Sequence, residues 1–168
     1  MIDSILKRRS CRLYINELIN ETLLLEILVA AQYAPTGMDK KAWQFIIVRD
    51  RDLKNKIASL SQQKLTFDAP VFIIPIIDTT ISVNPVEDLS IVSTYIMLQT
   101  KDCGLDSLWV YVNELDEENL KNLLNIPERF LLINILLIGY CKEVLYFHTQ
   151  EEFDKSKIHL DFFIDKIK

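Results

Sequence analysis

The sequence predicts an α+β domain in which layers of helices cover a mixed sheet. β-branched and aromatic runs of strand length alternate with segments of helical apolar periodicity along the 168 residues. One run, 130–139, is apolar on both faces, as expected of a central strand. The apolar content of 49% is enough for a sizeable core, and the length fits a single domain, 1–168.

The first half of the chain has clear helix boundaries. Asn20 is a predicted N-cap, and Pro35 and Gly37 end the helix that it begins. Pro75 lies inside a strand, where its missing N–H indicates a bulge or a sheet edge. The elements expected here are a short helix at 3–9, a helix at 20–34, a strand at 43–49, a helix at 50–61 and a strand at 69–77.

The second half contains a helix that is apolar on more than one side. Such a helix is buried on several faces, and contact with a second subunit is one way to achieve this in a small domain. Asp116 is the predicted cap of the next helix. The elements expected here are a helix at 87–103, a strand at 108–112, a helix at 116–124, a strand at 130–139 and a last helix near 151 or after 155.

Charge and hydropathy exclude several classes of partner. The net charge of −5 gives no reason to expect nucleic acid or an anionic membrane. The longest apolar stretch, 130–140, is interrupted by Asn134 and falls short of a membrane span, which takes about 20 residues. No apolar leader follows the first residues, so we expect a cytoplasmic protein.

Cysteine and histidine are too scattered to predict a metal centre. Cys11, Cys103 and Cys141 are widely spaced and odd in number, which favours buried or incidental thiols in a reducing compartment. His148 and His159 lie in a polar tail without neighbouring ligand types. We therefore predict no metal site.

Side-chain catalysis has little support either. The sequence contains no GxGxxG after a strand, no GxxxxGK[ST] and no GxSxG. These absences argue against a classical dinucleotide fold, a phosphate loop and a serine hydrolase. If the chain is an enzyme, we expect a cofactor to supply the chemistry, and we predict no catalytic side chain.

Cations gather near the start of the chain, at Lys7, Arg8, Arg9 and Arg12, with Ser10 among them. Guanidinium groups bind phosphate through paired, charge-assisted hydrogen bonds, and they suit a ring that becomes anionic on reduction. The alternative is that these cations complement the C-terminal end of a short helix and face solvent, which is the more frequent role of a charge run. This segment alone does not decide between the two.

Taken in order, the segments of the chain resemble the nitroreductase family. The family's opening Arg-Arg-Ser-x-Arg motif is matched by Arg8, Arg9, Ser10 and Arg12. A helix-to-strand loop, an Ala-Pro strand, a Gly-Leu turn and an Ile-Gly-Tyr strand end follow in family order, from about residue 2 to about residue 161. The matching residues are Ala30, Ala31, Ala34, Pro35, Thr36, Trp43, Phe45, Ala69, Pro70, Gly104, Leu105, Trp109, Ile126, Pro127, Glu128, Ile138, Gly139 and Tyr140.

The resemblance implies a three-layer fold with a mainly antiparallel sheet, and a homodimer with two FMN sites at its interface. A cation beside the N1/O2 edge of the flavin stabilises the reduced ring. The residues that would hold the phosphate, the ribityl chain and this edge are Arg8, Arg9, Ser10 and Arg12. The implied ring contacts are Pro35, Thr36 and Gly37 of the partner subunit, the amide of Gln62, and backbone N–H groups near Tyr111 and Val112.

The implied activity is hydride transfer from NAD(P)H through FMN to a nitroaromatic, a quinone or a similar small organic acceptor. No side-chain acid or base is needed for the hydride step. The chain departs from the family pattern in four ways. Asp39 and Lys41 replace amides, Tyr111 and Val112 stand where glycine is common, Ala42 replaces a proline, and Lys142 and His148 are the only candidates for a missing C-terminal arginine.

Two alternatives to this activity remain open from the sequence. One is a specialised relative of the family, such as a reductive dehalogenase-like or flavin-consuming enzyme. Those relatives tend to carry extra lid sequence, whereas this chain is short. The other is a non-catalytic or sensing flavin-binding protein of the same fold, which the departures at Asp39, Lys41, Tyr111 and Val112 favour.

Overall fold

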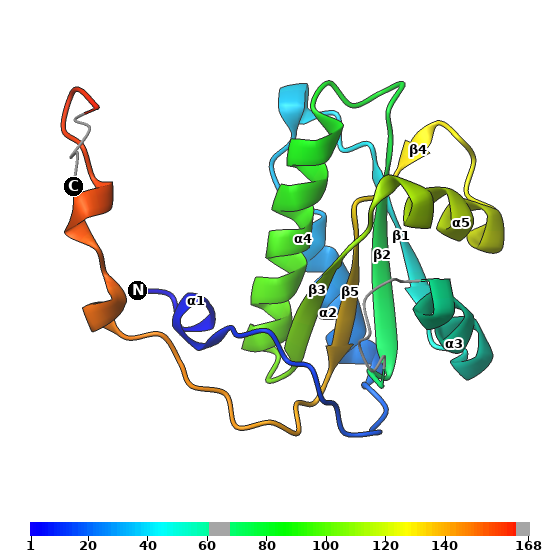
Figure 1. Ribbon diagram of the computed structural model, residues 1–168, viewed down its shortest axis with the longest axis horizontal. Helices are drawn as coiled ribbons and strands as arrows, with labels where there is room; N and C mark the ends of the chain where they lie inside the picture. The colour runs from blue at the N-terminus through cyan, green and yellow to red at the C-terminus, as the bar shows by residue number, and fades with distance from the viewer. Residues whose placement is uncertain (61–67, 164–168) are drawn as a thin grey trace.

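Two pairs of helices cover the two faces of one sheet in the computed structural model, which describes residues 1–60 and 68–163 (Figure 1). On one face lie α2 (Glu21–Ala31) and α4 (Pro85–Asp102), which pack against each other. On the other face lie α3 (Arg51–Leu60) and α5 (Glu114–Leu124). A short α1 (Asp3–Lys7) contacts α4. This arrangement confirms the predicted three-layer α+β fold.

The sheet is antiparallel in all the strand pairs of the described chain. The order β1-β2-β5-β3 leaves β1 and β3 at the edges, and β4 pairs with the far end of β2. The strands are β1 (Trp43–Val48), β2 (Val71–Asp78), β3 (Asp106–Tyr111), β4 (Phe130–Leu131) and β5 (Asn134–Gly139). The two central strands, β2 and β5, are buried along their whole length, as the apolar pattern predicts.

The apolar run at 130–139 forms two strands rather than one. β4 pairs with the end of β2 at Ile77 and Asp78, whereas β5 pairs with its start at 71–73. On one side of β2, Pro75 pairs with Phe45 of β1. On the other side, Pro75 lies between the residues that pair with β5 and those that pair with β4. Its missing N–H therefore lies at a local sheet edge, as predicted.

One predicted helix cap is confirmed and another is wrong. The Asn20 side chain accepts a hydrogen bond from the Thr22 N–H at 2.8 Å, which confirms it as the cap of α2. The cap of α5 is Asn113 and not Asp116, because the Asn113 side chain accepts from the Asp116 N–H at 2.9 Å. The last helix is reduced to two short 3₁₀ turns, Gln150–Glu152 and Lys155–Lys157.

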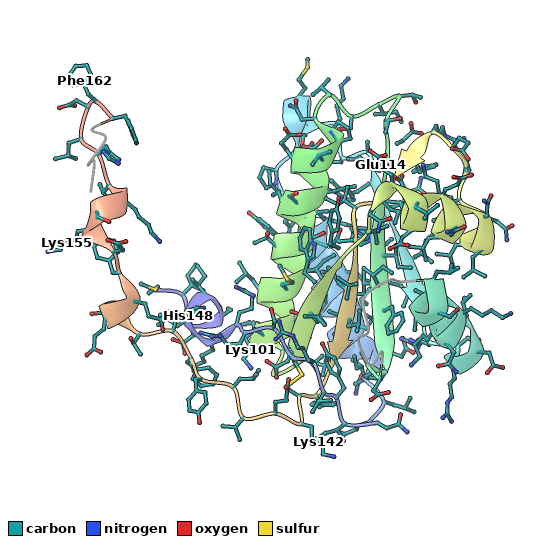
Figure 2. All side chains as sticks on the ribbon, viewed as in Figure 1. Lys101, Glu114, Lys142, His148, Lys155 and Phe162 are labelled. Carbon is teal, nitrogen blue, oxygen red and sulfur yellow. A yellow bond between two sulfur atoms is a disulfide. The ribbon has the colours of Figure 1, made fainter. Side chains whose placement is uncertain are left out.

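The C-terminal part of the chain leaves the body of the domain as an extended arm, residues 142–163 (Figure 1). His148 lies beside α1, while Lys155 and Phe162 lie far from the sheet (Figure 2). Large apolar side chains are exposed along the arm at Val144, Tyr146, Phe153, Leu160, Phe162 and Phe163. Among the described residues, no helix is both long enough and apolar enough to cross a membrane.

A buried polar pair joins α4 to β5 within the apolar core. Ser93 and Asn134 are both fully buried, and the Asn134 amide nitrogen donates to the Ser93 hydroxyl at 3.1 Å. The Ser93 hydroxyl is also within 3.3 Å of the Asn134 amide oxygen. This pair explains why asparagine is tolerated in an otherwise apolar central strand.

Replacing one member of this pair should cost more than replacing both. We expect Asn134→Leu to lower the free energy of unfolding by about 1–3 kcal/mol, because the Ser93 hydroxyl loses its buried partner. Ser93→Ala/Asn134→Leu should recover part of that loss, and Ser90→Ala on the exposed side of α4 is the control. Urea unfolding measures these three variants and Ser93→Ala alone; a double variant whose loss equals or exceeds the sum of the losses in Ser93→Ala and Asn134→Leu would contradict the coupling.

Candidate functional site

The guanidinium segment, residues 8–12, runs from α1 to the first residues of the edge strand β3. Ser10 forms a parallel bridge with Ser107, and the Cys11 N–H donates to the Ser107 carbonyl oxygen at 3.1 Å. Arg8, Arg9 and Ser10 are half-buried, and Arg12 is exposed. The backbone of the segment is therefore fixed to the sheet while its side chains remain accessible.

Two hollows lie beside this segment, and residues of the arm line part of each. Arg8 lines a mainly apolar cavity of about 710 Å³ between α1, α4 and the first turn of the arm. Arg9, Ser10 and Arg12 line a smaller cleft of about 330 Å³ against Glu143–Tyr146. The predicted phosphate-binding residues thus lie together at one corner of the domain, next to space that could take a ligand.

His148 ties the arm to this corner. Its backbone N–H donates to the Leu6 carbonyl oxygen at 3.0 Å, and its Nδ1 lies 2.6 Å from Glu152 and 3.4 Å from Arg9. Arginine can only donate and an ionised carboxylate can only accept, so Nδ1 serves one partner at a time. The shorter contact favours a proton on Nδ1 that is donated to Glu152. This hydrogen bond, helped by the Thr149 N–H and the charge of Arg9, lowers the pKa of Glu152.

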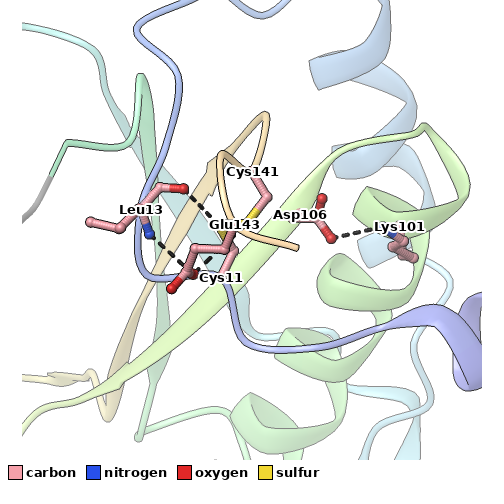
Figure 3. Close-up of polar contacts among 6 residues, drawn as sticks. All are labelled: Cys11, Leu13, Lys101, Asp106, Cys141 and Glu143. Atoms are coloured by element: carbon pink, nitrogen blue, oxygen red, sulfur yellow. Dashed lines mark hydrogen bonds and ion pairs between the residues drawn. A yellow bond between two sulfur atoms is a disulfide. The ribbon is translucent and has the colours of Figure 1, made fainter. Parts of the chain in front are cut away.

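A disulfide joins the guanidinium segment to the foot of the arm. Cys11 is bonded to Cys141 across 130 residues of sequence (Figure 3), which corrects the prediction that these cysteines are incidental thiols. The Glu143 carboxylate accepts from the N–H groups of Arg12 and Leu13 at 2.7 and 3.3 Å. The third cysteine, Cys103, is a free thiol whose pKa is raised by burial.

The same three side chains form a group of metal-ligand type. One ligand atom each from Cys11, Cys141 and Glu143 lies within 4.8 Å of the others. Zinc is bound by thiolates, and two sulfurs bonded to each other do not offer that chemistry. The structure therefore favours the disulfide over a metal at this position.

The loop that carries Pro35, Thr36 and Gly37 lies at the opposite end of α4. The Gly37 N–H donates to Asp88 in the first turn of α4 at 3.0 Å, and the Thr36 hydroxyl accepts from the Lys41 N–H at 3.1 Å. A Cβ on Gly37 would lie 2.6 Å from the Val83 side chain, so a larger residue here would force Val83 to move.

This loop holds its backbone in an unusual conformation. Met38, Asp39 and Lys41 all have positive φ angles, of 54°, 53° and 47°. Non-glycine residues in this region are uncommon and cluster at functional sites. Asp39 forms an exposed ion pair with Lys41 at 3.1 Å, so the carboxylate that replaces an amide is accompanied by a cation.

One chain does not bring the two predicted groups together. α4 has 18 residues and is therefore about 27 Å long. Gly37 lies at its N-terminal end, at Asp88. Ser10 lies beyond its C-terminal end, at Ser107, and Arg8 shares a hollow with Thr94 and Leu98 in its second half. The guanidinium segment and the Gly37 loop are therefore separated along the helix, by its full length at Ser10 and by part of it at Arg8.

Tyr111 and Val112 lie at the far end of β3. Val112 is five residues beyond Ser107, roughly 17 Å at the usual rise of a strand. Tyr111 has an exposed side chain, whereas Val112 is buried and its N–H donates to the Ile133 carbonyl oxygen at 3.0 Å. That N–H, which the sequence assigned to the flavin, is therefore already used within the sheet. Gln62 lies outside the described residues.

Several residues of this corner were not predicted from the sequence. Glu143 accepts hydrogen bonds from residues about 130 positions earlier in the sequence, and Glu152 contacts His148 of the arm. No sequence spacing connects either glutamate to the guanidinium segment. Lys101 and Asp106 form a mostly buried ion pair at 2.7 Å, beside the disulfide (Figure 3). The Arg-Arg-Ser-x-Arg motif, together with Lys142 and His148, indicates this place from the sequence, whereas the sequence predicts Cys11 to be an incidental thiol.

Comparison with known proteins gives consistent matches. The model of the nitroreductase family matches residues 5–70. A protein of Methanothermobacter thermautotrophicus, provisionally named NADH dehydrogenase/NAD(P)H nitroreductase, is 34% identical over 167 residues, which cover 96% of this chain and 86% of that protein.

Solved structures extend the likeness to the whole fold. An FMN-dependent nitroreductase from Clostridium difficile R20291 superposes with a TM-score of 0.91 at 29% identity, covering 97% of this chain and all of that one. A nitroreductase with bound FMN from Desulfitobacterium hafniense DCB-2 gives a TM-score of 0.75 at 25% identity, covering 94% and 95% of the two chains.

The lowered pKa of Glu152 provides a test of the contact with His148. Because the pKa is depressed, the carboxylate stays ionised from neutral pH to below 4.5, and its contribution to the attachment of the arm is lost only as the pH falls through the lowered value. In His148→Ala we expect the Glu152 pKa to rise back toward 4.5, as measured by NMR titration of the carboxyl carbon. Glu151, which is exposed and next in sequence, is the internal control; an unchanged midpoint for Glu152 would contradict the assignment.

Proposed function

The chain belongs to the nitroreductase family, and on this premise we propose that it is an FMN-dependent oxidoreductase. It takes reducing equivalents from NADH or NADPH and passes them to a small organic acceptor such as a nitroaromatic or a quinone. The names of its relatives, a NADH dehydrogenase/NAD(P)H nitroreductase and an FMN-dependent nitroreductase, support this assignment.

The observation that carries the proposal is the anchored guanidinium segment beside two open hollows. Three arginines and the Ser10 hydroxyl offer many donors within five residues, which is the chemistry that a phosphate monoester requires. The carboxylates nearby are already engaged: Glu143 by two backbone N–H groups and Glu152 by His148. The donor set therefore fits the phosphate end of FMN without a competing free carboxylate.

The arginines have a second role at the ring. When bound, FMN would supply the hydride-transfer chemistry between the nicotinamide and the acceptor. A guanidinium of Arg8, Arg9 or Arg12 near the N1/O2 edge would stabilise the negative charge of the reduced ring. The apolar side chains that line the larger hollow would lower the local dielectric around Arg8 and strengthen that electrostatic interaction.

A homodimer follows from the length of α4 and from the arm. Pro35–Gly37 lie at the N-terminal end of a helix about 27 Å long, whereas the guanidinium segment extends from beside its second half, at Arg8, to beyond its C-terminal end, at Ser10. We therefore assign the two groups to the same flavin site only through a second copy of the chain. The arm exposes several large apolar side chains, which a second subunit would cover. Each of the two sites then uses residues of both subunits.

The ring end of each site is assigned to three positions besides the Pro35–Gly37 loop. These are Tyr111 and Val112 at the end of β3, and Gln62. The negative charge of Asp39, two residues beyond Gly37, is offset by its ion pair with Lys41. Since the Val112 N–H is held by Ile133, we assign to Val112 a role in shaping the pocket rather than in donating to the ring. No side chain here is proposed as an acid or a base.

A second candidate function is flavin binding without turnover. The observation that favours it is the exposed Tyr111 side chain at a position where relatives commonly have glycine, which would narrow access to the ring. A protein of this kind retains FMN but does not exchange electrons with a nicotinamide.

The visible spectrum distinguishes the two functions. We expect the purified protein, loaded with FMN, to lose its flavin absorbance under anaerobic conditions when NADH or NADPH is added, and to regain it with a quinone. Dithionite, which reduces flavin without a binding site, is the control. Bound flavin that dithionite bleaches and neither nicotinamide does would exclude the oxidoreductase and support the second candidate.

Removing single guanidiniums tests the phosphate site. We expect Arg8→Ala and Arg9→Ala each to raise the Kd for FMN about 10- to 100-fold, because a charge-assisted hydrogen bond contributes about 1.5–3 kcal/mol. Lys7→Ala is the matched control, since Lys7 lies next in sequence but pairs with Asp3 on the solvent side. Flavin fluorescence titration measures all three, and equal affinities in the arginine variants and the control would refute the assignment.

A further inference from the structure

The Cys11–Cys141 disulfide joins two segments on which the proposed flavin site depends. Cys11 lies between Ser10 and Arg12 in the guanidinium segment, and Cys141 is the last residue before the arm. A covalent bond at this point holds the phosphate-binding corner and the foot of the arm together.

Without the covalent bond, the same junction is held by a small number of hydrogen bonds. The Ile15 N–H donates to the Tyr140 carbonyl oxygen, and the Lys142 N–H donates to that of Leu13, both at 2.9 Å. Glu143 adds the two contacts to the backbone of Arg12 and Leu13. Opening the disulfide therefore loosens the junction without removing it.

The two sulfur atoms differ in access. Cys11 is fully buried, whereas Cys141 is half-buried and is followed by the exposed Lys142. The greater exposure of Cys141 favours its sulfur over that of Cys11 as the target of an incoming thiolate. The leaving sulfur of Cys11 lies 3.1 Å from the Leu13 carbonyl oxygen, which can accept its S–H once that sulfur is protonated (Figure 3).

We propose that Cys11–Cys141 is a thiol–disulfide exchange site for a dithiol reductant, and that its redox state sets the affinity of the chain for FMN. The exchange itself stands on the geometry of the two sulfurs, and its consequence for FMN rests on the proposed function. Oxidation closes the junction and favours flavin binding; reduction loosens the foot of the arm and weakens flavin binding.

The exchange is a two-electron reaction. One thiolate of the reductant attacks the Cys141 sulfur, which breaks the Cys11–Cys141 bond and forms a mixed disulfide with Cys141. The Cys11 sulfur leaves as a thiolate and takes a proton. The second thiolate of the reductant then attacks the sulfur of the same reductant molecule that is bonded to Cys141. This step releases Cys141 as a thiolate, which is protonated in turn. The products are an oxidised reductant and two protein thiols.

Thiol counting tests the exchange directly. We expect the protein equilibrated with oxidised glutathione to carry one alkylatable thiol, Cys103, after denaturation, and three after treatment with dithiothreitol, as measured by intact mass with iodoacetamide. Cys103→Ser is the control; it should carry no alkylatable thiol after oxidised glutathione and two after dithiothreitol. Three thiols under both conditions, or a bound zinc ion released when the thiols are alkylated, would overturn the proposal.

Proteolysis of the arm and the affinity for FMN test the effect of reducing the disulfide. In the reduced protein we expect trypsin to cut after Lys142 about tenfold faster and the Kd for FMN to rise about tenfold, as for the loss of one modest interaction. Cys11→Ser/Cys141→Ser should show the reduced values with and without dithiothreitol. Equal cleavage rates and equal Kd values in oxidised and reduced wild type would refute the switch.

The two proposals fail in different ways. If FMN binds in neither redox state, the proposed function is wrong, while the thiol count and the cleavage rate still decide whether the exchange site exists. If FMN binds with the same Kd in both states, the proposed function stands and the redox control of FMN affinity is wrong.

Discussion

The length of α4 is the constraint on which the rest of the structure depends. This helix separates Ser10 of the guanidinium segment, held at Ser107 beyond its C-terminal end, from the Gly37 loop, held at Asp88 in its first turn. The edge strand β3 returns along it and ends at Tyr111, which pairs with Asn134, the hydrogen-bond partner of Ser93 in α4. On the proposed function, a flavin site that uses both groups would be built by two chains, and the apolar arm would supply further surface for that contact.

Most of the fold could be predicted from the sequence because local pattern and tertiary packing agree. The runs at 69–77 and 130–139, which the sequence predicts to be buried strands, contain the central strands β2 and β5, and Asn20 caps α2 as predicted. The errors arose where two local choices were nearly equal: Asn113 rather than Asp116 caps α5, since either side chain can accept a hydrogen bond from the first turn. The break between β4 and β5 depends on how β2 divides its partners, which no local pattern encodes.

The candidate site could be predicted only in part, and for a different reason. The arginines and the Pro35–Gly37 loop are proposed as flavin contacts because the order of short motifs along the chain matches a family. The disulfide and the cap by Glu143 join residues about 130 positions apart, so no sequence spacing could indicate them. The engagement of Val112 by Ile133 likewise depends on sheet register, which is set by packing.

Subunit complementation tests most directly whether each site is shared between two chains. Arg8→Ala/Arg9→Ala removes the proposed phosphate end, and Pro35→Glu places a carboxylate at the proposed ring end, at an exposed position. Mixing the two inactive proteins and allowing subunits to exchange should restore one FMN site per heterodimer, with NAD(P)H-dependent reduction of that flavin. No recovery of FMN binding in a mixture shown to contain heterodimers would mean that each site is built by one chain, and would contradict the account.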